Sequence, residues 1–73
     1  MSVRLMWSKA TGQHRDWQLL KEFETEEAAK ARAEVLSGAY PRALPSWASS
    51  SGAPARGFEY QRGDEAWLVE VDL

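Results

Sequence analysis

The sequence lacks most of the residue types on which catalytic and metal sites depend. It contains no cysteine and one histidine, His14, among 73 residues. Without thiols the chain forms no disulfide and offers no thiolate to a metal, which suits a reducing compartment. His14 falls in a polar stretch that supplies no partner for it, so we predict a solvated loop residue and no general base. We therefore expect no catalytic residue, no metal site and no cofactor.

Long apolar runs are missing as well. No stretch approaches the roughly 20 apolar residues that cross a bilayer. The first residues carry early charges, so we expect no secretory signal, no membrane segment and a cytoplasmic location. The formal net charge is −2, which argues against a general polyanion binder and favours a basic protein surface as partner.

A strand that leads directly into a helix is the clearest local pattern in a chain that has room for one domain, 1–73. Residues 17–23 are rich in aromatic and aliphatic side chains, as in a strand. Thr25 is a good N-cap, and strong helix formers follow it. Gly38 suits a left-handed C-cap, and Pro41 prevents the helix from continuing.

The expected helix carries an apolar stripe composed mainly of alanine. At about 100° per residue, one side of the helix collects Ala28, Ala29, Val35, Leu36 and Ala39, and the opposite side collects Glu26, Glu27, Lys30, Glu34 and Ser37. Arg32 points into the middle of the apolar stripe. Either its methylene stem lies along the core while its head reaches water or a carboxylate, or the sheet leaves this position uncovered and Arg32 contacts a partner.

Alternation of apolar and polar residues predicts two β-hairpins. In the first, Val3, Leu5 and Trp7 face the core, and the second strand places Trp17, Leu19, Lys21 and Phe23 on one face. In the second hairpin, strands at 58–62 and 67–73 are joined by Gly63 and Asp64, which suit a tight turn. In the last strand Trp67, Val69, Val71 and Leu73 alternate with Leu68, Glu70 and Asp72, and we expect the first four to face the core.

The predicted fold class is therefore α+β, in the order hairpin, helix, long loop, hairpin. One antiparallel sheet of four strands carries the helix on one face. We expect the other face to stay partly exposed, with three apolar members, Met6, Leu20 and Leu68.

Residues 38–57 predict the long loop. They contain all three prolines and the triple serine 49–51 but no acidic residue. Such a connection is unusual in a small domain and is often functional, and residues 45–48 suit one short helical turn. Tryptophan, tyrosine and arginine are enriched at binding hot spots. The candidate partner-binding residues are accordingly Tyr40, Arg42, Trp47 and Arg56, together with Arg32 of the helix. The alternative for Trp47 is that it closes one end of a thin core.

Direct binding of nucleic acid is disfavoured. Phe58, Tyr60 and Trp67 lie on predicted strands and could stack on bases. Carboxylates lie among them and would repel phosphate, namely Glu59, Glu65, Glu70 and Asp72. The same aromatic residues are better used as core beneath the helix.

In size and character the whole chain resembles the small acidic regulators that bacteriophages make against host enzymes, and more narrowly those that bind host RNA polymerase, block initiation and promote antitermination. The shared features are the acidic charge, the missing catalytic groups, an amino-acid usage typical of a GC-rich genome, and the surplus of tryptophan and arginine. The resemblance implies a large host enzyme as partner and the host bacterial cytoplasm as location, and it assigns no role to a numbered residue. An anti-CRISPR-type inhibitor fits the same logic. A small nucleic-acid-binding module and a bacterial housekeeping module are further alternatives.

Overall fold

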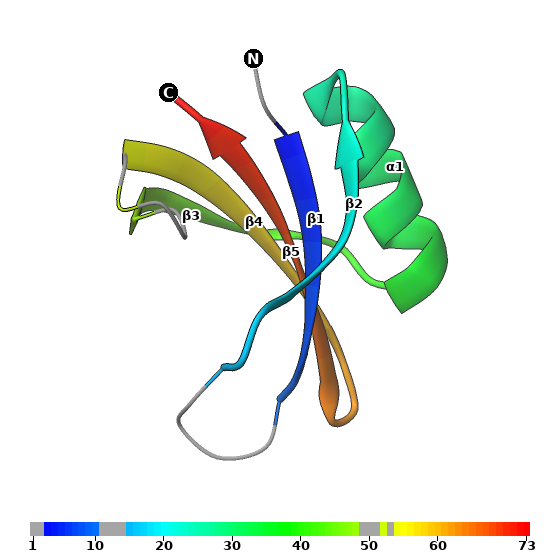
Figure 1. Ribbon diagram of the computed structural model, residues 1–73. Coiled ribbons are helices and arrows are strands. Elements are labelled where there is room, and N and C mark those ends of the chain that lie inside the picture. The colour runs from blue at the N-terminus through cyan, green and yellow to red at the C-terminus, as the bar shows by residue number, and fades with distance from the viewer. Residues whose placement is uncertain (1–2, 11–14, 49–51, 53) are drawn as a thin grey trace.

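The computed structural model describes residues 3–10, 15–48, 52 and 54–73, with the backbone alone at 45–48. An antiparallel sheet of five strands carries one helix (Figure 1). In chain order the elements are β1 (Val3–Lys9), β2 (Gln18–Phe23), α1 (Glu26–Ser37), β3 (Arg42–Ala48), β4 (Pro54–Arg62) and β5 (Glu65–Asp72). The strand order across the sheet is β2-β1-β5-β4-β3. The α+β class and the single small domain are thus confirmed.

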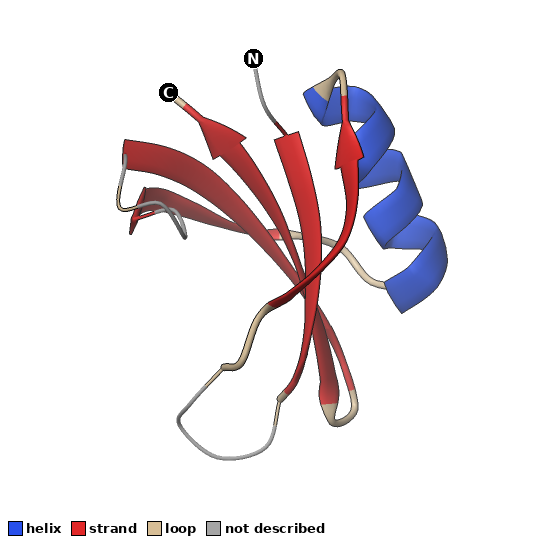
Figure 2. Ribbon diagram, in the orientation of Figure 1, coloured by secondary structure: helices blue, strands red, loops and turns tan. Residues whose placement is uncertain are grey.

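The sheet is strongly twisted, and the helix lies along one of its faces (Figure 2), where it contacts the central strand β5 most extensively. The core fills the space between this face and α1. It consists of buried side chains that alternate along the strands or repeat along the helix, namely Val3, Leu5, Ala29, Ala33, Tyr60, Trp67, Val69 and Val71. Trp7, Phe23, Leu36 and Phe58 pack around this cluster. The predicted core positions in β1 and β5 are confirmed, except that Leu73 is exposed.

Both helix caps are confirmed. The Thr25 hydroxyl oxygen accepts a hydrogen bond of 3.2 Å from the amide of Ala28, which satisfies one of the free donors of the first turn. Gly38 has the left-handed conformation, with φ of 64°, and its amide donates to the carbonyl of Glu34. The two-residue turn between β4 and β5 is confirmed too, with Gly63 at a φ of 59°.

The predicted buried face of the helix is correct for Ala29 and Leu36 but wrong for Ala28 and Val35, so the face is displaced by about one residue position. Ala29, Ala33 and Ser37 face the core, whereas Val35 is 72% exposed and Ala28 is exposed. The physical reason is that alanine occurs on both sides of the helix, so that apolar character selects a face only weakly. Ala29, Ala33 and Ser37, spaced i, i+4 and i+8, have small side chains that let the helix approach the sheet closely. Ser37 is tolerated in this face because its hydroxyl oxygen accepts the amide of Ala39 at 3.1 Å.

The predicted loop over 38–57 is wrong for most of its length, because residues 42–48 form the edge strand β3 and β4 begins at Pro54. An edge strand pairs on one side only, so a proline can occupy it or begin a strand without breaking the ladder. The register of β3 against β4 shifts between Leu44 and Trp47, the interval that contains Pro45. The helical turn predicted at 45–48 is likewise wrong.

The sheet face opposite the helix is also more buried than predicted. Met6 and Leu68 are buried there, and only Leu20 of the three expected residues is exposed. Part of the cover comes from β3, whose Leu44 side chain lies against Gly57. A Cβ at Gly57 would approach Leu68 Cδ1 to 3.2 Å, so a larger residue there would require the Leu68 side chain to move by a few tenths of an ångström. At the other end of the face, the Asp16 amide donates to Ser8 Oγ at 2.9 Å and brings the chain before β2 over β1.

An irregularity in β2 changes one further expectation. Leu5 pairs with Lys21 but Met6 pairs with Leu19, so Leu20 is an extra residue in the ladder. Leu19 therefore lies on the face of Met6, away from the helix, and the prediction that it shares a face with Lys21 and Phe23 is wrong.

Candidate protein-binding surface

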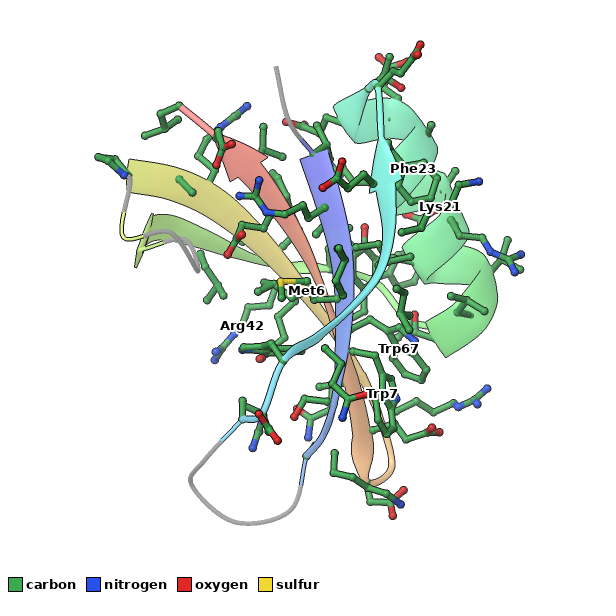
Figure 3. The ribbon with its side chains drawn as sticks, in the orientation of Figure 1. Met6, Trp7, Lys21, Phe23, Arg42 and Trp67 are labelled. Atoms are coloured by element: carbon green, nitrogen blue, oxygen red, sulfur yellow. The ribbon has the colours of Figure 1, made fainter. Side chains whose placement is uncertain are left out.

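The five predicted partner-binding residues do not converge on one site. Arg42 lies on the sheet face opposite the helix, together with its register partner Glu59. Figure 3 shows Arg42 and Met6 on one side of the sheet and Trp7 and Trp67 on the other. Arg56 lies on the helix side, and Arg32 and Tyr40 come from α1 and the segment that follows it.

Arg56 is held in an ion pair that connects β4 to the first turn of the helix. Its guanidinium Nη2 lies 2.8 Å from Glu26 Oε1. The other carboxylate oxygen of Glu26 lies 3.7 Å from Lys30 Nζ, and this ammonium lies over the Phe58 ring at 4.1 Å from the centroid. Lys30, predicted on the solvated side, is therefore half-buried in this cluster. Arg56 and Lys30 both attach the helix to the sheet.

Arg42 also has an internal partner, but a weaker one. Its Nη2 lies 3.4 Å from Glu59 Oε1, and the arginine side chain is 75% exposed. The Glu59 side chain is only 15% exposed, so the pair is open to solvent on the arginine side alone. Arg42 thus faces solvent on the sheet face away from the helix, with Glu59 as its partner.

Trp47 is described only by its backbone. It pairs with Ala55 of β4, which places the residue in a strand instead of the predicted loop. Its side chain lies outside the described part of the structure, as does the whole of His14.

Four exposed helix residues form one continuous surface, which we call the helix patch: Ala28, Ala31, Arg32 and Val35. At 3.6 residues per turn they fall within an arc of about 100°. This arc is turned away from the side that packs Ala29 and Ala33 against the sheet. The patch is apolar apart from Arg32, and the helix exposes it to solvent along about two turns.

Tyr40 extends the exposed apolar surface beyond the end of the helix. It follows Gly38 by two residues and is 93% exposed, more than any other large hydrophobic residue in the described part of the chain. Val35, in the last turn of α1, is the exposed large apolar residue nearest to it in sequence. Sequence periodicity grouped Ala28, Arg32 and Val35 in one stripe and assigned Ala28 and Val35 to the core, which is wrong. For Arg32 it left two alternatives, and the structure shows the position uncovered by the sheet.

A charged cluster lies on the opposite face of the sheet, between β1 and β5. Arg4 Nη2 lies 2.7 Å from Glu70 Oε1 and 2.7 Å from Asp72 Oδ1, and Arg4 Nε donates to Glu70 at 2.8 Å. The Glu70 side chain is only 2% exposed. The hydrogen bond from Arg4 holds the pKa of Asp72 below its ordinary value, and the pKa of Arg4 is raised in return. One cation shared by two carboxylates fits a structural role.

Burial also perturbs one core tyrosine. Desolvation raises the pKa of Tyr60 to about 12, with smaller contributions from the nearby charges of Glu34 and Glu26. Its hydroxyl donates a long hydrogen bond of 3.5 Å to the carbonyl of Lys30. Tyr60 thus stays neutral and belongs to the core.

In the described ranges 3–10, 15–48, 52 and 54–73, no group of three histidine or acidic side chains is arranged to hold a metal ion. None of the helical segments described there is long and apolar enough to cross a membrane. Comparison with known proteins found no matching family model, no matching curated protein and no matching solved structure.

Proposed function

We propose that this protein is a non-enzymatic regulator that binds host RNA polymerase and inhibits or redirects transcription. The observation that carries the proposal is the helix patch, which leaves Arg32 and Val35 exposed, with Tyr40 exposed beyond the end of the same helix. Exposed apolar side chains combined with arginine and tyrosine are the usual composition of the centre of a protein interface.

The geometry of the patch favours a helix that docks in a groove. Ala28, Arg32 and Val35 are spaced i, i+4 and i+7, which is the spacing of anchors in this mode of recognition. Alanine at two of the four patch positions permits close approach of a partner. The caps at Thr25 and Gly38 define the helix before binding, so that little ordering cost remains to be met at association.

The choice of RNA polymerase as partner rests on the whole-chain resemblance to phage regulators of that enzyme. The net charge of −2 agrees with a partner of basic overall character. It also disfavours direct competition for DNA, because carboxylates on an exposed surface repel phosphate.

The test uses purified bacterial RNA polymerase. Wild-type protein is expected to bind the enzyme and to change promoter initiation or terminator read-through in a transcription assay. The double variant Val35→Ala/Tyr40→Ala is expected to lose about 2 kcal/mol of binding free energy, as at a hot spot. Leu73→Ala is the matched control, because Leu73 is equally exposed but lies at the far end of β5.

Failure of wild-type protein to bind the polymerase would refute the proposed function. Binding that the double variant and the Leu73 control reduce equally would keep the partner and exclude the helix patch as the contact surface. Thermal unfolding of each variant separates lost binding from lost folding, since residues this exposed are expected to change stability by no more than about 0.5 kcal/mol.

A further inference from the structure

Arg32 differs from the other arginines of the described chain. Ion pairs hold four of them, Arg4, Arg42, Arg56 and Arg62, and Arg15 also has an interaction. Lys9 and Lys30 are paired with carboxylates, and Lys21 lies over the Phe23 ring. Within the described residues, Arg32 is thus the one cationic side chain with no internal partner.

The helix itself cannot supply a partner for Arg32. The positions that a helical side chain reaches are three and four residues away, and for Arg32 these are Ala28, Ala29, Val35 and Leu36. None of them can accept a hydrogen bond. The contrast is Lys30, which reaches Glu26 at i−4. The guanidinium of Arg32 therefore stands in an apolar, exposed patch with all of its donors available.

We propose that the protein partner presents a carboxylate, set in a shallow apolar groove, that binds the Arg32 guanidinium through two parallel hydrogen bonds. This inference rests on the proposed function, because it names the chemistry that the helix patch recognises. Arginine and carboxylate match in planar geometry, and their paired hydrogen bonds are charge-assisted. Ala28, Ala31 and Val35 would pack against the apolar walls of the partner's groove and exclude water from the ion pair.

A carboxylate fits the patch better than a phosphate does. Glu27 and Glu34 are exposed next to the patch on the same helix, and the chain carries a net negative charge. A nucleic acid would bring many phosphates against these carboxylates, whereas a protein groove can bring a single acidic side chain to Arg32. The three apolar patch residues also have no counterpart to contact on a phosphate backbone.

The test measures binding of four variants to nucleic-acid-free RNA polymerase: Arg32→Gln, Arg32→Lys, Arg32→Glu and the control Arg62→Gln. Arg62 is also exposed, at 61% of its side chain, and its removal changes the net charge equally. We expect Arg32→Gln to weaken binding by about 30-fold, as for a hot-spot residue. Arg32→Lys should recover only part of this loss because it lacks the planar fork. Arg32→Glu should bind most weakly, and Arg62→Gln should bind within about twofold of wild type.

Each outcome decides a different point. If wild-type protein binds and Arg32→Gln binds equally well, the inference is wrong and the proposed function stands. If wild-type protein does not bind the polymerase, both are wrong. Full recovery by Arg32→Lys would exclude the bidentate carboxylate. A parallel titration with a short DNA duplex completes the test, because wild-type binding that Arg32→Gln abolishes there would identify phosphate as the ligand and overturn the inference.

Discussion

Substitution of Arg4 tests how the sheet tolerates a nearly buried carboxylate. Arg4→Met keeps an unbranched side chain but removes the guanidinium that lies 2.7 Å from both Glu70 and Asp72. Glu70, at 2% side-chain exposure, then loses the charge-assisted hydrogen bond from Arg4. Removing one partner of a buried ion pair costs about 3–5 kcal/mol.

This cost is large in relation to the whole domain. At about 0.05–0.15 kcal/mol per residue, a chain of 73 residues has a total stability of about 4–11 kcal/mol. Arg4→Met should therefore shift the urea midpoint of unfolding far toward zero. Unfolding is measured by tryptophan fluorescence, to which the core residue Trp67 contributes. The double variant Arg4→Met/Glu70→Leu should recover most of the loss, because replacing a buried ion pair with apolar residues is often neutral. Arg62→Met, which breaks an exposed pair of 3.9 Å, is the control.

The pH dependence supplies an independent check on the same cluster. Because Arg4 lowers the pKa of Asp72 in the folded protein, the pair stabilises the fold above the unfolded-state pKa of Asp72. This contribution to stability is lost as the pH falls from about 4 through the lower pKa that Asp72 has in the folded protein. Arg4→Met should lack that part of the acid sensitivity. A single variant within about 1 kcal/mol of wild type at pH 7, or a double variant no more stable than the single one, would refute the reasoning.

Two further substitutions test the helix and the core. Thr25→Ala removes the acceptor of the Ala28 amide and should cost about 0.5–2 kcal/mol in urea unfolding; an unchanged midpoint would place the start of the helix elsewhere. Burial raises the pKa of Tyr60 to about 12. The stability linked to this shift is fully present below pH 10 and is lost as the pH rises toward 12. Wild type should thus lose about 2–3 kcal/mol over that interval that Tyr60→Phe does not lose, and parallel curves for the two proteins would contradict this.

The parts of the fold that depend on neighbouring residues could be predicted from the sequence. Thr25 and Gly38 fix the helix ends through bonds to amides and carbonyls a few residues away, and Gly63 with Asp64 forms the last turn. The alternation in β5 was readable because β5 lies in the middle of the sheet, between β1 and β4. A central strand with one face against the helix leaves its pattern unambiguous.

The parts that depend on distant contacts could not be predicted. Pro45 argued against a strand at 42–48, because proline is disfavoured in all but edge strands. The sequence gives no sign that this segment occupies the edge of the sheet. The burial of Met6 depends on the same missing information, since residues far apart in the chain cover that face. For the helix, alanine on both sides left the choice of face to tertiary packing, and packing selected Ala29 and Ala33.

Two features that the sequence did not predict, the strands at 42–48 and 54–57 and the orientation of the helix, affect where a partner-binding surface can lie. Because 42–48 and 54–57 join the sheet, Arg42 and Arg56 come within reach of Glu59 and Glu26 and form ion pairs there. Because the helix is rotated by about one residue relative to the prediction, Arg32 and Val35 are exposed to solvent. Among the residues that the structure describes, no carboxylate pairs with Arg32 there. Internal pairing thus weakens the sheet arginines as candidates, whereas Arg32, already a candidate from the sequence, is exposed beside Val35. The surface best suited to a partner is consequently the part of the apolar stripe that the fold does not use.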